Sequence, residues 1–263
     1  MSPLGPARRP APEPGGALRL AAALEATAPH PATAPPAGAP DEDRLLPVPE
    51  ALAPLVPGAG LARGAVTEVA DTGMGLLWAL AGTAARDPHH TPAHRWIAIV
   101  GIPEAGLLAL TETGADPDRL LLADRPGRHW ADIAAALAGA VDILVLRPPT
   151  PVTAETARRL GAVLRRGRAA LLTPAPWPGS TLRLAVAGSA WLGLGQGHGL
   201  IHSRQVQVEA TGRGRAGGPA RTTEIWLPDP DGRIRTIEPG EHRLPETPGQ
   251  APAAARLTAI AHQ

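Results

Sequence analysis

From Leu45 onward the chain alternates short, fully apolar runs with longer segments of helical periodicity. The apolar runs predict strands at 66–70, 96–100, 120–123, 141–146 and 169–173. The segments between them predict helices that begin after Gly75, span 105–113, run from Trp130 to Gly139, and run from Thr153 to the arginines at 165, 166 and 168. Strands without polar alternation are typical of parallel sheets that helices cover on both faces. The pattern therefore predicts an α/β fold built on a mostly parallel sheet.

The pattern changes at both ends of this segment. Before it, the proline-rich stretch 52–64 predicts a loop that ends in a turn. After Pro174, the runs 182–186, 203–209 and 223–227 either alternate polar with apolar residues or are bounded by turn residues, as antiparallel strands are. Asp231–Gly232 predicts a hairpin turn. We therefore expect a C-terminal antiparallel β meander to follow the parallel core.

Three regions differ in composition. Residues 1–44 are rich in Pro and Ala and predict a disordered segment, in which 18–24 is a short helix or, preferably, a frayed turn. Residues 45–238 form the predicted core domain. Residues 239–263 predict a flexible tail, within which 253–261 either forms one amphipathic helix after Pro252 or stays disordered.

Composition narrows the class of protein. The 263 residues include no cysteine, which excludes a disulfide scaffold and cysteine-based metal sites. The net charge of +1 predicts no strong field for nucleic acid, and no apolar run reaches the length of a membrane span. Pro and Gly interrupt any signal-peptide core near the N-terminus, so we expect a soluble cytoplasmic protein without membrane contact.

The segment 64–80 has the frame of a phosphate-binding loop: a strand, a glycine turn and an apolar helix. Its loop positions are Asp71, Thr72, Gly73, Gly75, Leu76 and Leu77. In a working loop a lysine reaches the outer phosphates and a Ser/Thr hydroxyl holds magnesium, but Leu76 and Leu77 stand at those two positions. All 25 basic residues of the chain are arginines, which we attribute to a GC-rich coding bias. Bias alone does not explain the local loss, because arginine does not replace a compact ammonium at a phosphate site. The segment therefore predicts the scaffold of a nucleotide hydrolase that has no catalytic residues and binds no cofactor.

Four motifs, in this order, resemble the RecA core and, more narrowly, the RecA-like accessory proteins of bacterial mutagenesis cassettes (the ImuA type, actinobacterial ImuA-prime branch). The motifs are 64–69, 114–121, 141–146 and 171–174, and the resemblance runs from about Leu46 to Ile234. It implies a RecA-like, mostly parallel sheet flanked by helices, with a degenerate phosphate loop. The family pattern places a magnesium-organising Asp where this chain has Arg147, followed by Pro148. It also places a water-activating carboxylate near Glu104, for which a solvated loop role is the preferred alternative.

The resemblance implies a non-enzymatic adaptor in the DNA-damage response. Its partners would be an ImuB-like Y-family polymerase homologue and a DnaE-type error-prone polymerase, which the adaptor would support in translesion synthesis. Weak DNA contact and self-association remain open, although the long DNA-binding loops of RecA have no counterpart and the segment 193–199 is short. Two alternatives remain: a SulA-like cell-division inhibitor, and a residual DNA- or ATP-binding recombination mediator.

Other residues suggest chemistry less strongly. His89, His90 and His94, with Asp87, can be interpreted as metal ligands, but their Pro-flanked loop favours no metal site, and His198 and His202 flank a glycine turn. Ser180 lacks the context of a hydrolase nucleophile. Arg165, Arg166, Arg168, Arg213, Arg215 and Arg221 are candidates for phosphate contacts, without aromatic partners for base stacking. Trp177 and Trp191 are candidates for partner contacts or, alternatively, for filling the core.

Overall fold

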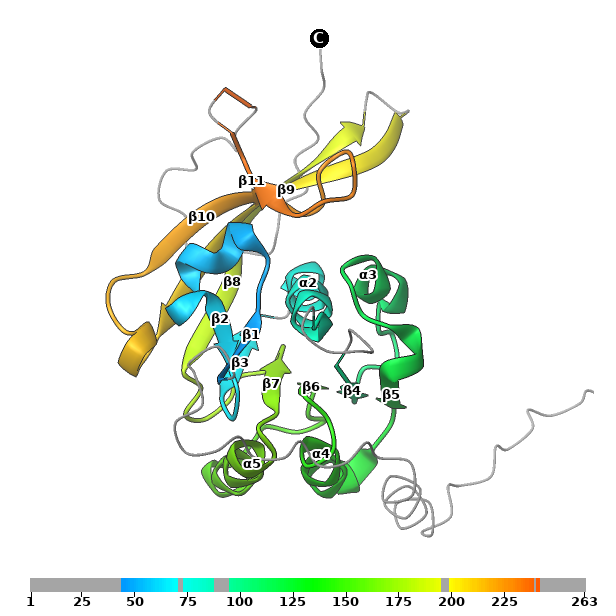
Figure 1. Ribbon diagram of the computed structural model, residues 1–263, viewed down its shortest axis with the longest axis vertical. Helices are drawn as coiled ribbons and strands as arrows, with labels where there is room; N and C mark the ends of the chain where they lie inside the picture. Colours follow the sequence, from blue (N-terminus) through cyan, green and yellow to red (C-terminus); the bar gives the residue numbers. More distant parts are fainter. Residues whose placement is uncertain (1–43, 71–72, 88–94, 195–198, 239, 242–263) are drawn as a thin grey trace, which may run out of the picture.

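The computed structural model describes residues 44–70, 73–87, 95–194, 199–238 and 240–241 (Figure 1). Its strands are β1 (Leu45–Pro47), β2 (Gly60–Ala62), β3 (Val66–Val69), β4 (Ile97–Val100), β5 (Leu120–Ala123), β6 (Ile143–Leu146), β7 (Ala170–Thr173), β8 (Leu182–Leu194), β9 (Gly199–Gly212), β10 (Arg221–Trp226) and β11 (Arg235–Thr236). Its α-helices are α2 (Met74–Ala85), α3 (Leu107–Glu112), α4 (Trp130–Ala138) and α5 (Ala154–Gly167). Its 3-10 helices are η2 (Glu50–Leu55), η3 (Pro57–Ala59), η5 (Pro117–Arg119), η6 (Gly127–His129) and η7 (Gly214–Ala216).

The large sheet has nine strands in the order β11-β10-β9-β8-β3-β7-β6-β4-β5. From β8 to β5 all neighbours are parallel, whereas β8, β9, β10 and β11 pair antiparallel with one another. Helices α2 and α3 cover one face of the parallel part, and α4 and α5 cover the other (Figure 1). The predicted α/β class, with a mostly parallel sheet and a C-terminal antiparallel meander, is confirmed.

Alternate residues of each parallel strand enter two separate cores, because successive side chains of a strand point to opposite faces. In β6, Ile143 and Val145 pack with the cluster beneath α2, whereas Leu144 and Leu146 pack with the cluster beneath α4 and α5. The same alternation holds in β4 and β7. These strands therefore read as continuous apolar runs because both of their faces are buried.

Helix α2 is buried around almost its whole circumference. It packs against α3, β1 and strands β3, β6 and β7, and nine of its twelve residues are buried. Its contact with α3 is close at Gly82, where an added Cβ would lie 2.0 Å from Thr113 Oγ1 and 2.6 Å from the Leu110 carbonyl oxygen. The side chain of Thr113 donates a hydrogen bond to the Trp78 carbonyl at 3.1 Å across the same contact. Glycine at this position therefore sets the distance between the two helices.

The element types predicted from the parallel part are confirmed, and the structure adds detail at their ends. Thr153 caps α5, since its side-chain oxygen accepts a hydrogen bond from the Thr156 amide at 3.2 Å. Gly114 follows α3 with a φ of 123°, a left-handed backbone value that favours glycine. The predicted turn at Asp231–Gly232 joins β10 to β11, which pair antiparallel.

Of the predictions from the flanking segments, one was wrong and another was right in type but too short. The stretch 52–64 is not a plain loop but contains most of η2, η3 and the strand β2, which pairs antiparallel with β1. The two strands predicted at 182–186 and 203–209 are much longer, and they form one hairpin with register shifts between Val186 and Gly188 and between Leu192 and Leu194. The predictions for 18–24 and 253–261 lie outside the described residues.

The last hairpin is held by a small network of carboxylates. Asp229, which is 1% exposed, accepts hydrogen bonds from the amides of Asp231 and Arg233 and from the Arg235 side chain. Burial alone would raise the pKa of Asp229, but these hydrogen bonds outweigh it and hold the pKa below its ordinary value. Hydrogen bonds from the Arg235 guanidinium, the Trp226 indole and the Glu238 amide lower the pKa of Glu241 to about 2.

We predict that this network makes the hairpin sensitive to acid. Because both carboxyl pKa values are lowered by folding, their stabilisation is complete above about pH 4, the ordinary range of such groups, and is lost as the pH falls toward 2. Glu241→Gln should therefore lower the free energy of unfolding at pH 7 and flatten its decline between about pH 4 and 2. Denaturant unfolding at a series of pH values measures both effects. Glu112→Gln, an exposed carboxylate on α3, is the control, and an equal flattening in that variant would contradict the assignment.

Candidate functional site

The candidate site lies where β3 leads into α2, at the carboxyl end of the parallel strands. Gly73 is the residue before α2, and its amide donates a hydrogen bond to the Ala70 carbonyl at 2.6 Å. An added Cβ at Gly73 would lie 3.3 Å from Val69 Cγ1, so the turn passes close to the end of β3. The predicted frame of strand, glycine turn and apolar helix is thus present, while Asp71 and Thr72 lie outside the described residues.

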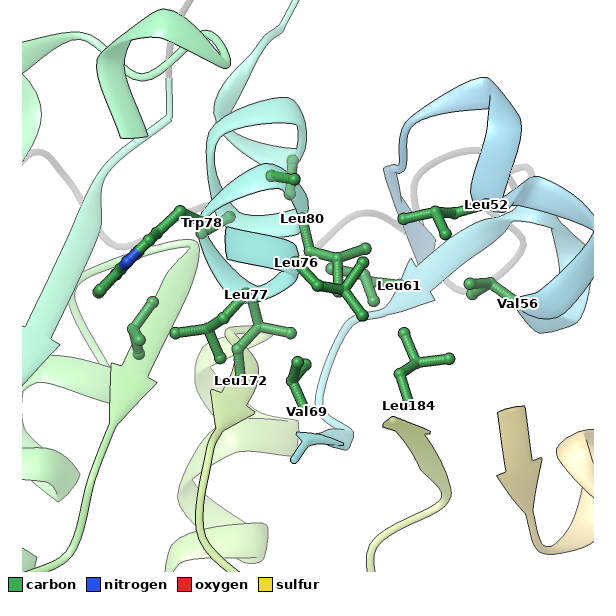
Figure 2. Close-up of a cluster of buried hydrophobic side chains, with 14 of the residues drawn as sticks. Leu52, Val56, Leu61, Val69, Leu76, Leu77, Trp78, Leu80, Leu172 and Leu184 are labelled. Carbon is green, nitrogen blue, oxygen red and sulfur yellow. The ribbon is translucent and has the colours of Figure 1, made fainter. Parts of the chain in front are cut away.

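Leu76 and Leu77 point into the core rather than toward the turn. Both side chains are 0% exposed. Figure 2 shows Leu76 beside Leu61 and Leu77 near Leu172, with Val69 below them. Burial of a leucine side chain contributes roughly 2 kcal/mol of transfer free energy, whereas a buried unpaired ammonium is strongly unfavourable. The two positions are therefore part of the hydrophobic core and offer no polar side chain to a phosphate.

An arginine, Arg147, follows strand β6 at the position where the resemblance predicted a magnesium-organising carboxylate. Its guanidinium forms an ion pair with Glu104, which follows the neighbouring strand β4. One guanidinium nitrogen lies 3.5 Å from the sulfur of Met74, the first residue of α2. Arg147 therefore extends from the end of β6 to the start of α2.

The close approach of the two strand ends depends on Gly101. Its φ is 76°, and an added Cβ would lie 2.2 Å from the Arg147 carbonyl oxygen. Across the same pair of strand ends, the Arg147 amide donates a hydrogen bond to the Val100 carbonyl at 2.9 Å. A hydrogen bond from its own backbone amide, followed by the Arg147 side chain, lowers the pKa of Glu104, so this carboxylate stays ionised and paired at neutral pH. The sequence-based interpretation of Glu104 as a solvated loop residue missed this ion pair.

The described residues do not fit a nucleotide with magnesium. The positions for lysine and hydroxyl are buried leucines, and the position for a metal-organising carboxylate holds an arginine, which would repel a divalent cation. No group of three or more His, Asp or Glu side chains that could hold a metal occurs in the described part of the chain. We derive no chemical step from this site.

The other candidate residues are dispersed. His89, His90, His94 and His198 lie outside the described residues, whereas Asp87 pairs with Arg95 at 3.0 Å and His202 lies 2.9 Å from the Ser203 hydroxyl. Ser180 lies in the turn before β8. None of the described helices has both the length and the apolar character needed to cross a membrane.

The two tryptophans that the sequence singled out differ in burial. Trp177 is 4% exposed and belongs to the core beneath α4 and α5, so its interpretation as a partner contact was wrong. Its backbone amide donates a hydrogen bond to the buried Glu68 at 2.8 Å. Trp191 is half-buried on β8, and the Arg204 guanidinium lies 5.0 Å from its ring centre.

Four of the six arginines proposed for phosphate contacts come together around one cavity, and the other two do not. Arg165, Arg168, Arg213 and Arg215 line this cavity with Arg44 and Arg63. Sequence reasoning missed Arg44 and Arg63 because they lie far from the other four along the chain. The cavity is at the amino end of the sheet, away from the α2 turn.

Comparison with known proteins gives two findings. A family model described as the MT3502 N-terminal domain matches residues 54–179, just under half of the chain, from η2 through β7. The chain is also similar to the uncharacterized protein Rv3395c of Mycobacterium tuberculosis, with 41% identity over 90 residues. That alignment covers 34% of this chain and 44% of the mycobacterial protein, so the chain spans less than half of this relative.

We predict that restoring the lysine will destabilise the protein instead of creating a nucleotide site. Leu76→Lys places an ammonium in the core and should lower the free energy of unfolding by at least about 3 kcal/mol. In a domain of this size the melting temperature should fall by about 6 to 12 °C. Thermal unfolding measures the change, with Leu76→Met as the control, because that swap should cost less than about 1.5 kcal/mol. A stable Leu76→Lys/Leu77→Thr variant with measurable ATP turnover would refute our account of both motifs.

We also predict that the unmodified protein does not respond specifically to ATP. Saturation of a real site at 100 times its dissociation constant would add about 2.7 kcal/mol to the stability. Because buried leucines occupy the positions of the phosphate-binding lysine and the magnesium-binding hydroxyl, Mg-ATP should leave the melting temperature unchanged to within about 1 °C. Inorganic tripolyphosphate serves as the control for unspecific binding to arginines. A rise of several degrees with Mg-ATP but not with tripolyphosphate would contradict the prediction.

Proposed function

We propose that the protein is a non-catalytic, RecA-like adaptor that supports error-prone translesion synthesis after DNA damage. It would bind a Y-family polymerase homologue of the ImuB type and a DnaE-type polymerase. The proposal rests on the resemblance to ImuA-type accessory proteins, and the matches to the MT3502 N-terminal domain and to a mycobacterial protein are consistent with an actinobacterial branch of that group.

One observation carries the non-catalytic part of the proposal. Leu76 and Leu77 are fully buried in the core, and Arg147 lies beside the start of α2 in an ion pair with Glu104. A scaffold that had lost only one catalytic residue would still retain an open turn. Here the former ligand positions have become structural, which favours use of the sheet as a rigid platform.

An adaptor needs surfaces that a partner can cover, and the chain offers exposed apolar residues. Leu200 and Ile201, near the start of β9, are 79% and 46% exposed. They lie on the long β8–β9 hairpin, which projects from the body of the protein (Figure 1). Large apolar side chains at such exposure are favourable partner contacts. We infer that this hairpin, together with the C-terminal tail, contributes to the polymerase contact.

We predict that the tagged chain, recovered from its own host after DNA damage, will retain a Y-family polymerase homologue and a DnaE-type subunit, identified by mass spectrometry. Leu200→Ser/Ile201→Ser should reduce this recovery several-fold, because it removes most of the apolar contact at the hairpin. Leu108→Ser, an exposed leucine on α3, is the control and should leave the recovery unchanged.

Other outcomes of this experiment would count against the proposal. Recovery of the division machinery alone would favour the SulA-like inhibitor. Recovery of neither polymerase would reject the adaptor and leave the nucleic-acid-binding mediator as the better hypothesis. If the control reduces recovery as strongly as the hairpin variant, the hairpin is not the contact.

A further inference from the structure

A cavity of about 640 Å³ opens at the amino end of the parallel strands, opposite the α2 turn. Its lining residues come from the C-terminal end of α5, the η7 turn and the small β1–β2 sheet, among others. Residues from before β3, before β7 and at the start of β8 close it on the side of the large sheet. This volume falls in the range of sites that hold small ligands or short peptide segments.

Among the described residues, six arginines and no carboxylate line the cavity: Arg44, Arg63, Arg165, Arg168, Arg213 and Arg215. They come from segments that are distant in the sequence. Arg63 donates hydrogen bonds to Asp142 at 3.1 Å and to the Arg168 carbonyl at 3.2 Å, so it is partly neutralised. Within the described part of the chain, Arg165, Arg213 and Arg215 form no ion pair. These three guanidinium groups therefore have no carboxylate partner among the described residues.

Two glycines bring these arginines together. Gly64 has a φ of 77°, and an added Cβ would lie 2.9 Å from the Arg165 Cα, so the turn before β3 touches the end of α5 directly. Gly214 has a φ of 60° and separates Arg213 from Arg215 in the η7 turn. Like charges held close together cost free energy, and an anionic ligand recovers it.

The walls between the arginines are apolar. This favours an acidic peptide over a nucleic acid as the anionic ligand. Leu45, Val56, Leu61 and Leu182 contribute to the lining. None of the lining residues is aromatic, so nucleobases would find no ring on which to stack. A chain of carboxylates with apolar side chains between them satisfies both features, because guanidinium groups bind carboxylates in a bidentate manner while the apolar side chains cover the leucines.

We propose that this cavity binds an acidic segment of a partner protein in which Asp or Glu residues alternate with Leu, Ile or Val. Only the source of the segment, a partner protein, rests on the proposed adaptor function. The cavity would then be a second contact, separate from the β8–β9 hairpin. Its arginines would determine the charge of the bound segment and its leucines the spacing of the apolar residues.

Fluorescence anisotropy with the purified full chain tests the proposal. The probe is a fluorescein-labelled peptide that alternates Glu or Asp with Leu. A second peptide has Ser at every Leu position and the same charge, and a labelled oligothymidine represents nucleic acid. The Leu peptide should bind, with the Ser peptide at least about tenfold weaker because the apolar contacts are lost.

The site is tested by charge reversal. Arg213→Glu/Arg215→Glu should weaken binding of the Leu peptide by at least about tenfold, because it replaces two cations of the cavity with anions. The matched control is Arg125→Glu/Arg158→Glu, which makes the same change in charge on two exposed arginines that do not line the cavity. The control should bind like the unmodified protein, and thermal unfolding should show that both variants are folded.

Three results would overturn the proposal. They are equal losses in the two variants, tighter binding of oligothymidine than of the Leu peptide, and no binding of either probe. Tight oligothymidine binding that Arg213→Glu/Arg215→Glu removes would make the cavity a nucleic-acid site instead. Because the titration uses the purified chain alone, its failure rejects the cavity and leaves the polymerase recovery standing. Failure of that recovery with intact peptide binding rejects the adaptor.

Discussion

The burial of helix α2 is the constraint on which the rest of the candidate site depends. The helix touches α3, β1 and three strands of the sheet, so it has almost no face left for solvent. In such a position each side chain must be apolar or small, since a buried charge without a partner is strongly unfavourable. Leu76 and Leu77 satisfy this condition, and the first turn of the helix therefore contributes to packing instead of ligand binding.

The adjacent strand ends also hold a structural contact at the position where the resemblance predicted a magnesium-organising carboxylate. Arg147 and Glu104 come from β6 and β4, whose ends lie side by side because the strands are parallel neighbours. An arginine alone beside the start of a helix would leave an uncompensated charge near the positive end of the helix dipole. Glu104 neutralises it, so the ends of β4 and β6 carry a neutral ion pair beside the start of α2. Restoring one ligand would therefore not restore a nucleotide site.

Local sequence signals predicted the parallel core well, because its strands are short, apolar and buried on both faces. The hairpin of β8 and β9 was underestimated, since Gly188 and Ser189 interrupt the alternation at a bulge that only the pairing reveals. The β1–β2 sheet was missed because prolines within 47–57 resemble those of a loop. The leucines at 76 and 77 were visible in the sequence, whereas the ion pair of Arg147 with Glu104 depends on strand order.

The arginine cavity shows why net charge says little about local fields. The chain carries almost equal numbers of acidic and basic residues, which led us to expect no strong field. However, several carboxylates pair with arginines that do not line the cavity, as in Glu68 with Arg183 and Glu241 with Arg235. These carboxylates are already held by other arginines, and neither of them lines the cavity. The two ends of the sheet thus differ in chemistry: a neutral ion pair lies beside the α2 turn at one end, and arginines that could receive an anionic partner line the cavity at the other.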